Sequence, residues 1–149
     1  MTAVRDASWE SQRVLVTGGG GFVGSHLVEA LVARGACVTV VDCLEQPWRL
    51  HAVLPNITYC NADLADGPFT ASMEPRFTHM FHLAAFSMLS AAEEQPDTAY
   101  RQNVIGTVKL LQLARRCPLK KFVFSSAGGL YTNVPKYLPI DERHPIDPA

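Results

Sequence analysis

The stretch "RVLVTGGGGFVGSHLVEALVARG", residues 13–35, joins two kinds of periodicity without a gap. Its first five residues, Arg13 to Thr17, form a short valine-rich run that is typical of a buried strand. Apolar residues then recur at helical spacing, and Gly35 stands just past the expected helix end, where glycine is common. The stretch predicts a strand, a glycine-rich turn and a helix, whose regularly spaced residues are Val23, Leu27, Ala30, Leu31 and Arg34.

The turn itself carries three regularly spaced glycines, Gly18, Gly21 and Gly24. Glycines between a strand and a helix let a phosphate approach bare backbone at the helix N-terminus, where free N–H groups and the helix dipole favour an anion. Asp42 ends the next predicted strand, 18 residues after Gly24, where a carboxylate can accept hydrogen bonds from an adenosine ribose. A carboxylate there also repels the extra phosphate of NADP, so NAD is the expected cofactor.

A simpler interpretation of the same residues stays open. The glycines could serve only to pack the helix tightly on the strand, and Asp42 could be an ordinary acid at a strand end. The strand and helix that flank the glycines favour the dinucleotide-binding interpretation.

The rest of the chain continues to alternate strand and helix patterns. Strands are predicted at 37–42, 57–63, 79–85 and 121–126, and one helix from Asp97, its candidate N-cap, to Arg116, before Pro118. The helix pattern includes Val104, Thr107, Val108, Leu111 and Ala114. The connections after the second and third strands contain proline and predict at most short helical turns. This alternation predicts an α/β fold, a doubly wound parallel Rossmann-like sheet with strand order 3-2-1-4-5 that is truncated at its C-terminal side.

Length and composition limit the function classes. The 149 residues suit one domain with one core, an NAD-binding Rossmann domain over 1–149 with a flexible N-terminus (1–12) and a loop-rich segment (128–149). Thirteen Lys+Arg against 14 Asp+Glu, without a basic run, argue against nucleic acid and anionic membranes as partners. No apolar run approaches the roughly 18 residues of a membrane span, and a cytoplasmic protein is expected. The four cysteines lack metal or disulfide spacing and are expected to be reduced and mostly in the core.

Five short motifs together resemble one family, the extended short-chain dehydrogenases/reductases, and within it the NAD-dependent nucleotide-sugar epimerases and dehydratases. They are "TGGGGFVG", "NADL", "HLAA", "NVIGT" and "FSSAGGLY", and they span nearly the whole chain. The resemblance implies NAD as cofactor and a nucleotide sugar as a second ligand. It also implies roles for residues along the chain: Phe22 and Val23 at the pyrophosphate beside Gly18, Gly21 and Gly24, Asp42 at the ribose, Asp63 and Leu64 at the adenine, Ala84 and Ala85 at the middle of the cofactor, and Asn103 as a brace.

The family's acid–base chemistry is not fully represented in this chain. Members pair a Ser or Thr at the end of the fifth strand with a Tyr-x-x-x-Lys on the next helix, whose lysine lowers the tyrosine pKa. Here Tyr131 and Lys136 are five residues apart and Pro135 interrupts any helix between them. Aligned from the strand, Ala127 takes the position of the hydroxyl residue, and Ser126, one residue earlier, is the candidate catalytic residue if the turn is shifted. The 149-residue chain alone is therefore predicted to be inactive.

Several alternatives remain open from the sequence. The chain is the cofactor part of an NAD-dependent epimerase or dehydratase, a fragment of a longer enzyme, or a non-catalytic NAD-binding or protein-interaction module. A sheet with one face uncovered near Phe122, Val123 and Phe124 predicts a homo-oligomer, or a partner chain that covers the sheet. His82 is expected to be a hydrogen-bonded core histidine, and Asn103 either faces solvent or braces the site.

Overall fold

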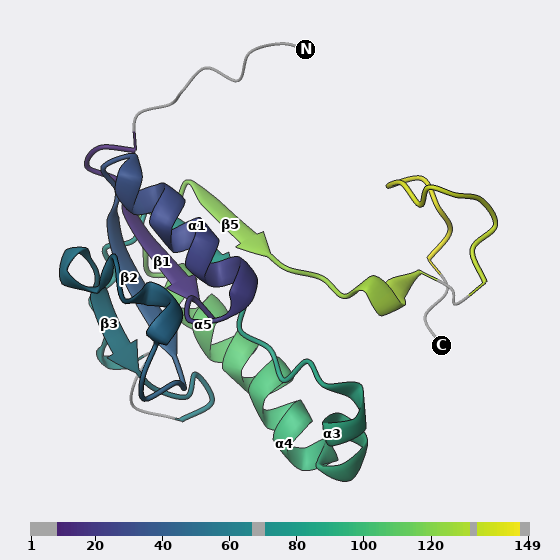
Figure 1. The fold of residues 1–149 in the computed structure, drawn as a ribbon. Helices are drawn as coiled ribbons and strands as arrows, with labels where there is room; N and C mark the ends of the chain where they lie inside the picture. The colour runs from purple at the N-terminus through teal and green to yellow at the C-terminus, as the bar shows by residue number, and fades with distance from the viewer. Residues whose placement is uncertain (1–8, 67–70, 132–133, 147–149) are drawn as a thin grey trace.

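One parallel sheet of five strands organises the chain, and the computed structural model describes residues 9–66, 71–131 and 134–146. The strand order is β3-β2-β1-β4-β5, and every pairing is parallel, as predicted (Figure 1). The strands are β1 Arg13–Thr17, β2 Cys37–Asp42, β3 Thr58–Asn61, β4 His79–His82 and β5 Lys121–Phe124. The helices are α1 Phe22–Ala33, α3 Leu89–Glu94, α4 Pro96–Tyr100 and α5 Gly106–Ala114, with a π-helical segment Arg101–Ile105 and 3₁₀ turns Trp48–Leu50, Leu54–Asn56 and Gly128–Leu130.

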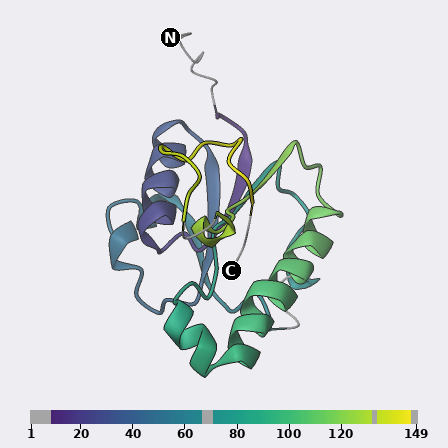
Figure 2. The same ribbon diagram turned by 90° about the vertical axis from the view of Figure 1, so that its right-hand side faces the viewer.

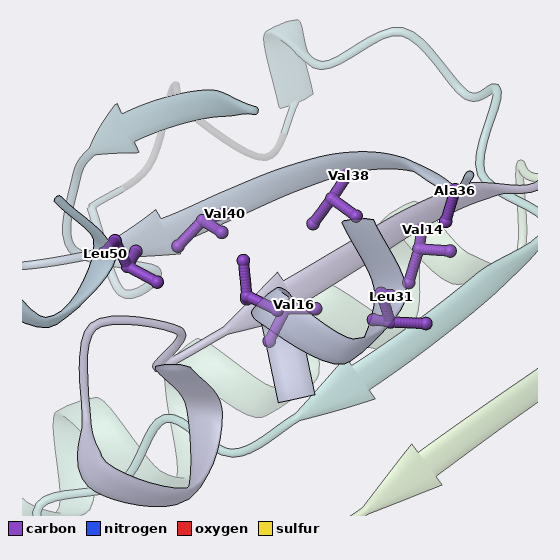
Figure 3. Close-up of a cluster of buried hydrophobic side chains, with 8 residues drawn as sticks. Val14, Val16, Leu31, Ala36, Val38, Val40 and Leu50 are labelled. Carbon is purple, nitrogen blue, oxygen red and sulfur yellow. The ribbon is translucent and has the colours of Figure 1, made fainter. Parts of the chain in front are cut away.

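Helices cover both faces of the sheet, α1 on one side and α5 on the other (Figure 2). Because side chains alternate along a strand, β1 contributes to both layers. Val14 and Val16 pack with Val38, Val40 and the α1 residues in the cluster drawn in Figure 3. Leu15 lies in the second cluster, whose buried members are Leu15, Val41, Leu64, Phe77, Met80, Leu110 and Leu113. Because every pairing is parallel, all carboxyl strand ends lie at one edge of the sheet.

Three strands are shorter than the sequence predicts. β3 ends at Asn61 because the Asp63 carboxylate accepts the Ala65 N–H at 2.8 Å and turns the chain away. β4 stops at His82, which is paired with Thr17 at the end of β1, and β5 stops at Phe124, which is paired with His82. Single ladder bonds continue past these ends, from Leu83 N–H to the Thr17 carbonyl (3.1 Å) and from Ser125 N–H to the His82 carbonyl (3.0 Å).

The helix predicted from Asp97 to Arg116 is present as one helical run over residues 96–114, but its regularity and its N-cap differ from the prediction. The segment is divided into α4, the π-helical segment and α5, and α3 precedes it, which the sequence pattern did not indicate. Asp97 is not the N-cap: α4 begins at Pro96 with Gln95 as its cap, and Asp97 lies in the first turn. Proline suits the first helical position because its missing N–H would have no helical partner there.

The buried faces of both long helices are displaced from the predicted stripes. α1 buries Gly24, Ser25, Val28 and Leu31, and Val23 is exposed beside the turn. α5 buries Gly106, Leu110 and Leu113, whereas Val104, Val108 and Leu111 are 42%, 45% and 43% exposed. Small residues explain the displacement, because a Cβ at Gly106 would already lie 3.2 Å from the Leu64 Cβ. The helices face the sheet where glycine allows close approach.

The chain after β5 leaves the sheet and forms a loop cluster of its own (yellow in Figure 1). Tyr131 forms an isolated antiparallel bridge with Ile146. His144 is buried at the centre, where the rings of Tyr131 and Tyr137 lie 5.8 and 4.9 Å from its own. At the other end, Trp9 packs against His79 and Phe81.

The lengths of the helices and the positions of the cysteines bear on two expectations from the sequence. Among the described residues, no helix combines the length and apolar character needed to cross a membrane. The four cysteines are free thiols, as predicted. The expectation that most lie in the core is wrong, because Cys37 and Cys43 are exposed near the two ends of β2 and Cys60 and Cys117 are only partly buried.

Candidate functional site

A cavity of about 500 Å³ lies at the carboxyl edge of the sheet. In an open α/β sheet, this edge is where ligands bind, at the point where the strand order reverses between β1 and β4. The cavity contains every residue predicted to contact a cofactor except Asn103. Its lining is Gly18, Gly21, Phe22, Val23, Gly24, Val41, Asp42, Cys43, Leu44, Ala62, Asp63, Leu64, Leu83, Ala84, Ala85, Ser87 and Gln102.

The glycine turn brings backbone into direct contact with backbone. Gly18 has φ +71°, a conformation that side chains rarely adopt, and a Cβ there would lie 2.6 Å from the Ala84 nitrogen. A Cβ at Gly24 would overlap the carbonyl oxygen of Gly18. The helix α1 therefore starts at the cavity, with the first-turn residues Phe22 and Val23 in its lining. First-turn N–H groups have no helical carbonyl to pair with, so this end of α1 can receive an anion.

The Asp42 carboxylate is held in place by two backbone donors. Its Oδ2 accepts the N–H of Gly20 at 2.9 Å, and its Oδ1 accepts the N–H of Leu44 at 3.1 Å. Each carboxylate oxygen can accept more than one hydrogen bond, so capacity remains for ligand hydroxyls. Asp42 thus joins the end of β2 to the glycine turn and places a negative charge at the cavity wall.

The wall beyond Asp42 is formed by the ends of β2 and β3. Asp63 uses Oδ1 to hold the turn at Ala65, and Leu64 is buried. The Tyr59 hydroxyl donates to the Leu44 carbonyl at 2.6 Å. Burial, with a smaller contribution from Asp42, raises the pKa of Tyr59 to about 12, so this hydroxyl keeps its proton and the hydrogen bond.

The opposite wall is the loop after β4, which carries Ala84 and Ala85. Asn103 does not line the cavity but holds this loop: its Oδ1 accepts the Phe86 N–H at 2.7 Å and its Nδ2 donates to the Phe86 carbonyl at 3.1 Å. Paired bonds of this kind fix the loop backbone relative to the helix. Asn103 is exposed, and its side-chain amide is nevertheless bonded to the loop backbone, which agrees with a bracing role.

His82 lies directly beneath the same loop. It is 2% exposed, and its ring nitrogens lie 2.7 Å from Thr17 Oγ1 and 2.8 Å from Thr107 Oγ1. The expectation of a hydrogen-bonded core histidine is confirmed. Among the described residues, no group of three or more His, Cys, Asp or Glu could hold a metal ion.

The candidate acid–base residues are not gathered at the cavity. Ser126 is exposed just after β5 and is absent from the cavity lining. Tyr131 packs on His144, and the backbone N–H of Lys136 donates to His144 Nε2 at 3.0 Å. All three residues therefore lie in the segment that leaves the sheet.

The sequence did not predict seven of the lining residues as site residues: Val41, Cys43, Leu44, Ala62, Leu83, Ser87 and Gln102. Cys43 and Leu44 directly follow Asp42, and Gln102 directly precedes Asn103, so adjacency to predicted residues is the signal that could have found them. Ser87 lies in the loop held by Asn103, whose course depends on a contact between distant parts of the chain.

Comparison with known proteins identifies one family and relatives that are named as epimerases. The sequence model of the NAD dependent epimerase/dehydratase family matches residues 14–149. A putative UDP-glucose 4-epimerase of Methanocaldococcus jannaschii is 35% identical over 136 residues, which cover 91% of this chain and 44% of that protein. The chain spans less than half the length of the curated relatives it matches.

Two solved structures resemble the fold closely. An epimerase from Methanothermobacter thermautotrophicus superposes with a TM-score of 0.82 at 31% identity, over 93% of this chain and 42% of that one. The Thermus thermophilus UDP-glucose 4-epimerase, solved as a complex with NAD, gives a TM-score of 0.78 at 35% identity. The match covers 92% of this chain and 45% of that one. In both comparisons the similarity covers more than nine-tenths of this chain.

Proposed function

Because this chain belongs to the NAD-dependent epimerase/dehydratase family, we propose that it binds NAD in the cavity at the carboxyl edge of its sheet and forms the cofactor-binding part of a nucleotide-sugar epimerase or dehydratase. One observation carries the proposal. The glycine turn, the start of α1 and the Asp42 carboxylate all border a single cavity of about 500 Å³. An anion site beside a fixed carboxylate suits a dinucleotide, which combines a pyrophosphate with ribose hydroxyls.

Different residues of the cavity bind different parts of the cofactor. The first-turn backbone at Phe22 and Val23 receives the pyrophosphate, where Gly18, Gly21 and Gly24 leave room for it. Asp42 accepts the adenosine ribose hydroxyls, with Asp63 and Leu64 at the adenine. Ala84 and Ala85 lie along the middle of the cofactor, on the loop that Asn103 holds. When bound, NAD supplies a hydride acceptor and donor.

Asp42 also determines the choice between NAD and NADP. Its charge is already oriented by Gly20 and Leu44, so it cannot turn away from an added ribose phosphate without losing two hydrogen bonds. Repulsion of that dianion favours NAD.

The second ligand we propose is a nucleotide sugar. Relatives of this chain carry the names of UDP-glucose 4-epimerases, and one related structure contains UDP-glucose. Ser126 is the candidate for the hydroxyl that would meet the sugar, since it follows β5 at the carboxyl edge. We place the protein in the cytoplasm, where free thiols such as the exposed Cys37 persist.

A second candidate is a non-catalytic NAD-binding or protein-interaction module. Two features favour it: by the family resemblance, Ala127 takes the position of the hydroxyl residue, and Tyr131 packs on His144 and is absent from the cavity lining. Hydride exchange between labelled NAD and a panel of nucleotide sugars separates the two candidates. Exchange above background supports the enzyme, and NAD binding without exchange supports the module.

Self-association is also part of the proposal. Along α4, the π-helical segment and α5, the apolar residues Tyr100, Val104, Val108 and Leu111 form an exposed stripe at helical spacing, and Phe124 of β5 is 57% exposed. Apolar surface of this kind tends to recruit another chain. We propose a homo-oligomer, or a partner chain, that covers this surface.

Calorimetric titration with NAD tests the central proposal. Gly21→Val should weaken binding, because a branched side chain at the start of α1 occupies the space a phosphate needs; its Cβ would lie 3.3 Å from the Gly18 carbonyl oxygen, so a thermal melt of the variant must accompany the titration to show that it is folded. Gly129→Val is the matched control, since a Cβ at Gly129 meets nothing within 4 Å. If NAD fails to bind, or if both variants bind it as the unmodified chain does, the proposal is wrong.

A further inference from the structure

A continuous series of hydrogen bonds passes through His82 and has both of its ends, Ala84 and Phe86, on the loop after β4. On one side the Ala84 N–H points to Thr17 Oγ1 at 3.4 Å, and Thr17 Oγ1 lies 2.7 Å from His82 Nδ1. On the other side His82 Nε2 lies 2.8 Å from Thr107 Oγ1, which donates to the Asn103 carbonyl at 2.6 Å. Asn103 then holds Phe86 through both atoms of its amide.

The direction of each proton in this series follows from what each group can donate. The Asn103 carbonyl only accepts, so the Thr107 hydroxyl must donate to it and accept from His82 Nε2. A neutral imidazole that carries its proton on Nε2 has a bare Nδ1, which accepts from the Thr17 hydroxyl. The Thr17 oxygen keeps a lone pair for the Ala84 N–H.

Every polar group in the series is satisfied in this one protonation state. A proton added at Nδ1 would point at Thr17 Oγ1, which the Ala84 N–H already approaches, and the Thr17 hydroxyl proton would lose its acceptor. Thr17 is fully buried, so no water could replace that acceptor without rearrangement. The arrangement therefore selects the neutral ring with its proton on Nε2.

We propose that His82, in its neutral form protonated on Nε2, is a positioning residue that fixes the loop from Ala84 to Phe86 against the glycine turn and the Asn103 segment, and so shapes the middle of the cofactor cavity. This inference rests on the proposed function, because it assigns the fixed loop a role in holding NAD. His82 touches no cavity space itself, since Leu83, Ala84 and Ala85 line the wall above it.

The surroundings of the ring support the neutral state. Thr17 comes from β1, Thr107 from α5, and Phe122 and Phe124 from β5, with ring centroids 6.5 and 5.4 Å from that of His82. None of these four side chains carries a charge that would favour imidazolium. Burial lowers the pKa of His82, which agrees with the direction of the hydrogen bonds.

The helix side of the series coincides with the irregular part of the helix. Asn103 lies in the π-helical segment Arg101–Ile105, where the backbone bonding is wider than in an α-helix. The Thr107 hydroxyl donates a hydrogen bond to the Asn103 carbonyl within that segment. His82 thus secures the Asn103 carbonyl through Thr107, while the Asn103 side chain secures the loop.

The test compares Thr107→Val with Thr107→Ser. Valine keeps the shape of threonine but removes the hydroxyl, whereas serine keeps the hydroxyl. Thr39→Val is the control, a buried threonine of the neighbouring strand β2 that is not part of the series. We expect Thr107→Val to weaken NAD binding roughly three- to tenfold and to speed hydrogen exchange of the Ala84 and Phe86 amides. Thr107→Ser should restore both, and Thr39→Val should change neither beyond its effect on stability.

Nitrogen NMR of the imidazole provides a measurement that needs no cofactor and no variant. The unmodified chain should show His82 as the neutral tautomer protonated on Nε2. The inference is overturned if His82 carries its proton on Nδ1, or if Thr107→Val leaves both NAD affinity and amide exchange at their original values. If the unmodified chain binds no NAD, the proposed function fails, while the tautomer and the exchange of Ala84 and Phe86 still decide whether His82 fixes the loop.

Discussion

The α-carbon of Gly24 faces the carbonyl oxygen of Gly18 so closely that a side chain at Gly24 has no room. Gly24→Ala would force the start of α1 away from the turn, because its Cβ would meet backbone rather than a movable side chain. We expect the free energy of unfolding to fall by about 1–3 kcal/mol, the usual cost of overpacking. Chemical denaturation measures it. Gly129→Ala, where a Cβ meets nothing within 4 Å, should stay within about 0.5 kcal/mol of the original.

Replacing the carboxylate of Asp42 should reduce the preference for NAD over NADP. Asp42→Asn keeps the size of the side chain but removes the negative charge. That charge opposes a ribose phosphate, and it also strengthens the hydrogen bonds that the side chain accepts. The difference in binding free energy between the two cofactors should shrink by about 1.5–3 kcal/mol, the range for hydrogen bonds to charged groups. Titration with each cofactor gives the value.

Glu45→Gln provides the matched charge change three residues away and outside the cavity lining. It should leave the preference for NAD intact. Equal loss of preference in both variants would show that general negative charge, rather than the placed Asp42 carboxylate, discriminates between the cofactors.

The stability of the chain should decrease as the pH falls below about 6.5. Burial lowers the pKa of His82 in the folded state from the ordinary value of 6.5. The unfolded chain then binds more protons than the folded chain between the lowered pKa and 6.5. The stabilisation is complete above 6.5 and is lost as the pH drops through that window.

His82→Gln should flatten this pH dependence, because glutamine does not titrate. His79, whose pKa is also lowered by burial and by Lys120, contributes in the same direction and remains in the variant. Denaturation at a series of pH values compares the two slopes. An unchanged slope in His82→Gln would assign the pH dependence to other groups.

Charged residues on the exposed helical stripe should reduce self-association. Val108 and Leu111 are 45% and 43% exposed, so lysine at both positions is compatible with the fold. Sedimentation over a range of concentrations should shift toward the monomer in Val108→Lys/Leu111→Lys. Leu54→Lys, at another exposed apolar residue, should not shift it. A compact monomer at all concentrations in the unmodified chain would instead contradict the proposed oligomer.

The sequence predicted the parts of the fold that depend on local pattern. β1 and β2 have the predicted bounds, because each is an apolar, valine-rich run that ends at a polar residue or a turn. The glycine spacing and Asp42 predicted the part of the cavity lining formed by the glycine turn and the end of β2, because the turn and the strand end determine the positions of Gly18, Gly21, Gly24 and Asp42 directly.

The parts that were missed depend on contacts between distant residues. The division of the predicted helix coincides with the bonds between Asn103 and Phe86, 17 residues apart, which helical spacing does not reveal. The buried face of α5 follows from the approach of Gly106 to Leu64 rather than from the spacing of Val104 and Val108. The tautomer of His82 likewise depends on hydroxyls from two other elements.

The alternation of β1 between the two hydrophobic clusters makes this short strand intolerant of a register slip. Val14 and Val16 face α1, and Leu15 faces α5. Inserting or deleting one residue before Val14 would exchange the two faces, so both clusters would lose their central side chains together. We therefore expect the two hydrophobic clusters to unfold together. The slowest-exchanging amides of β1, β2 and β4 should open in a single cooperative event.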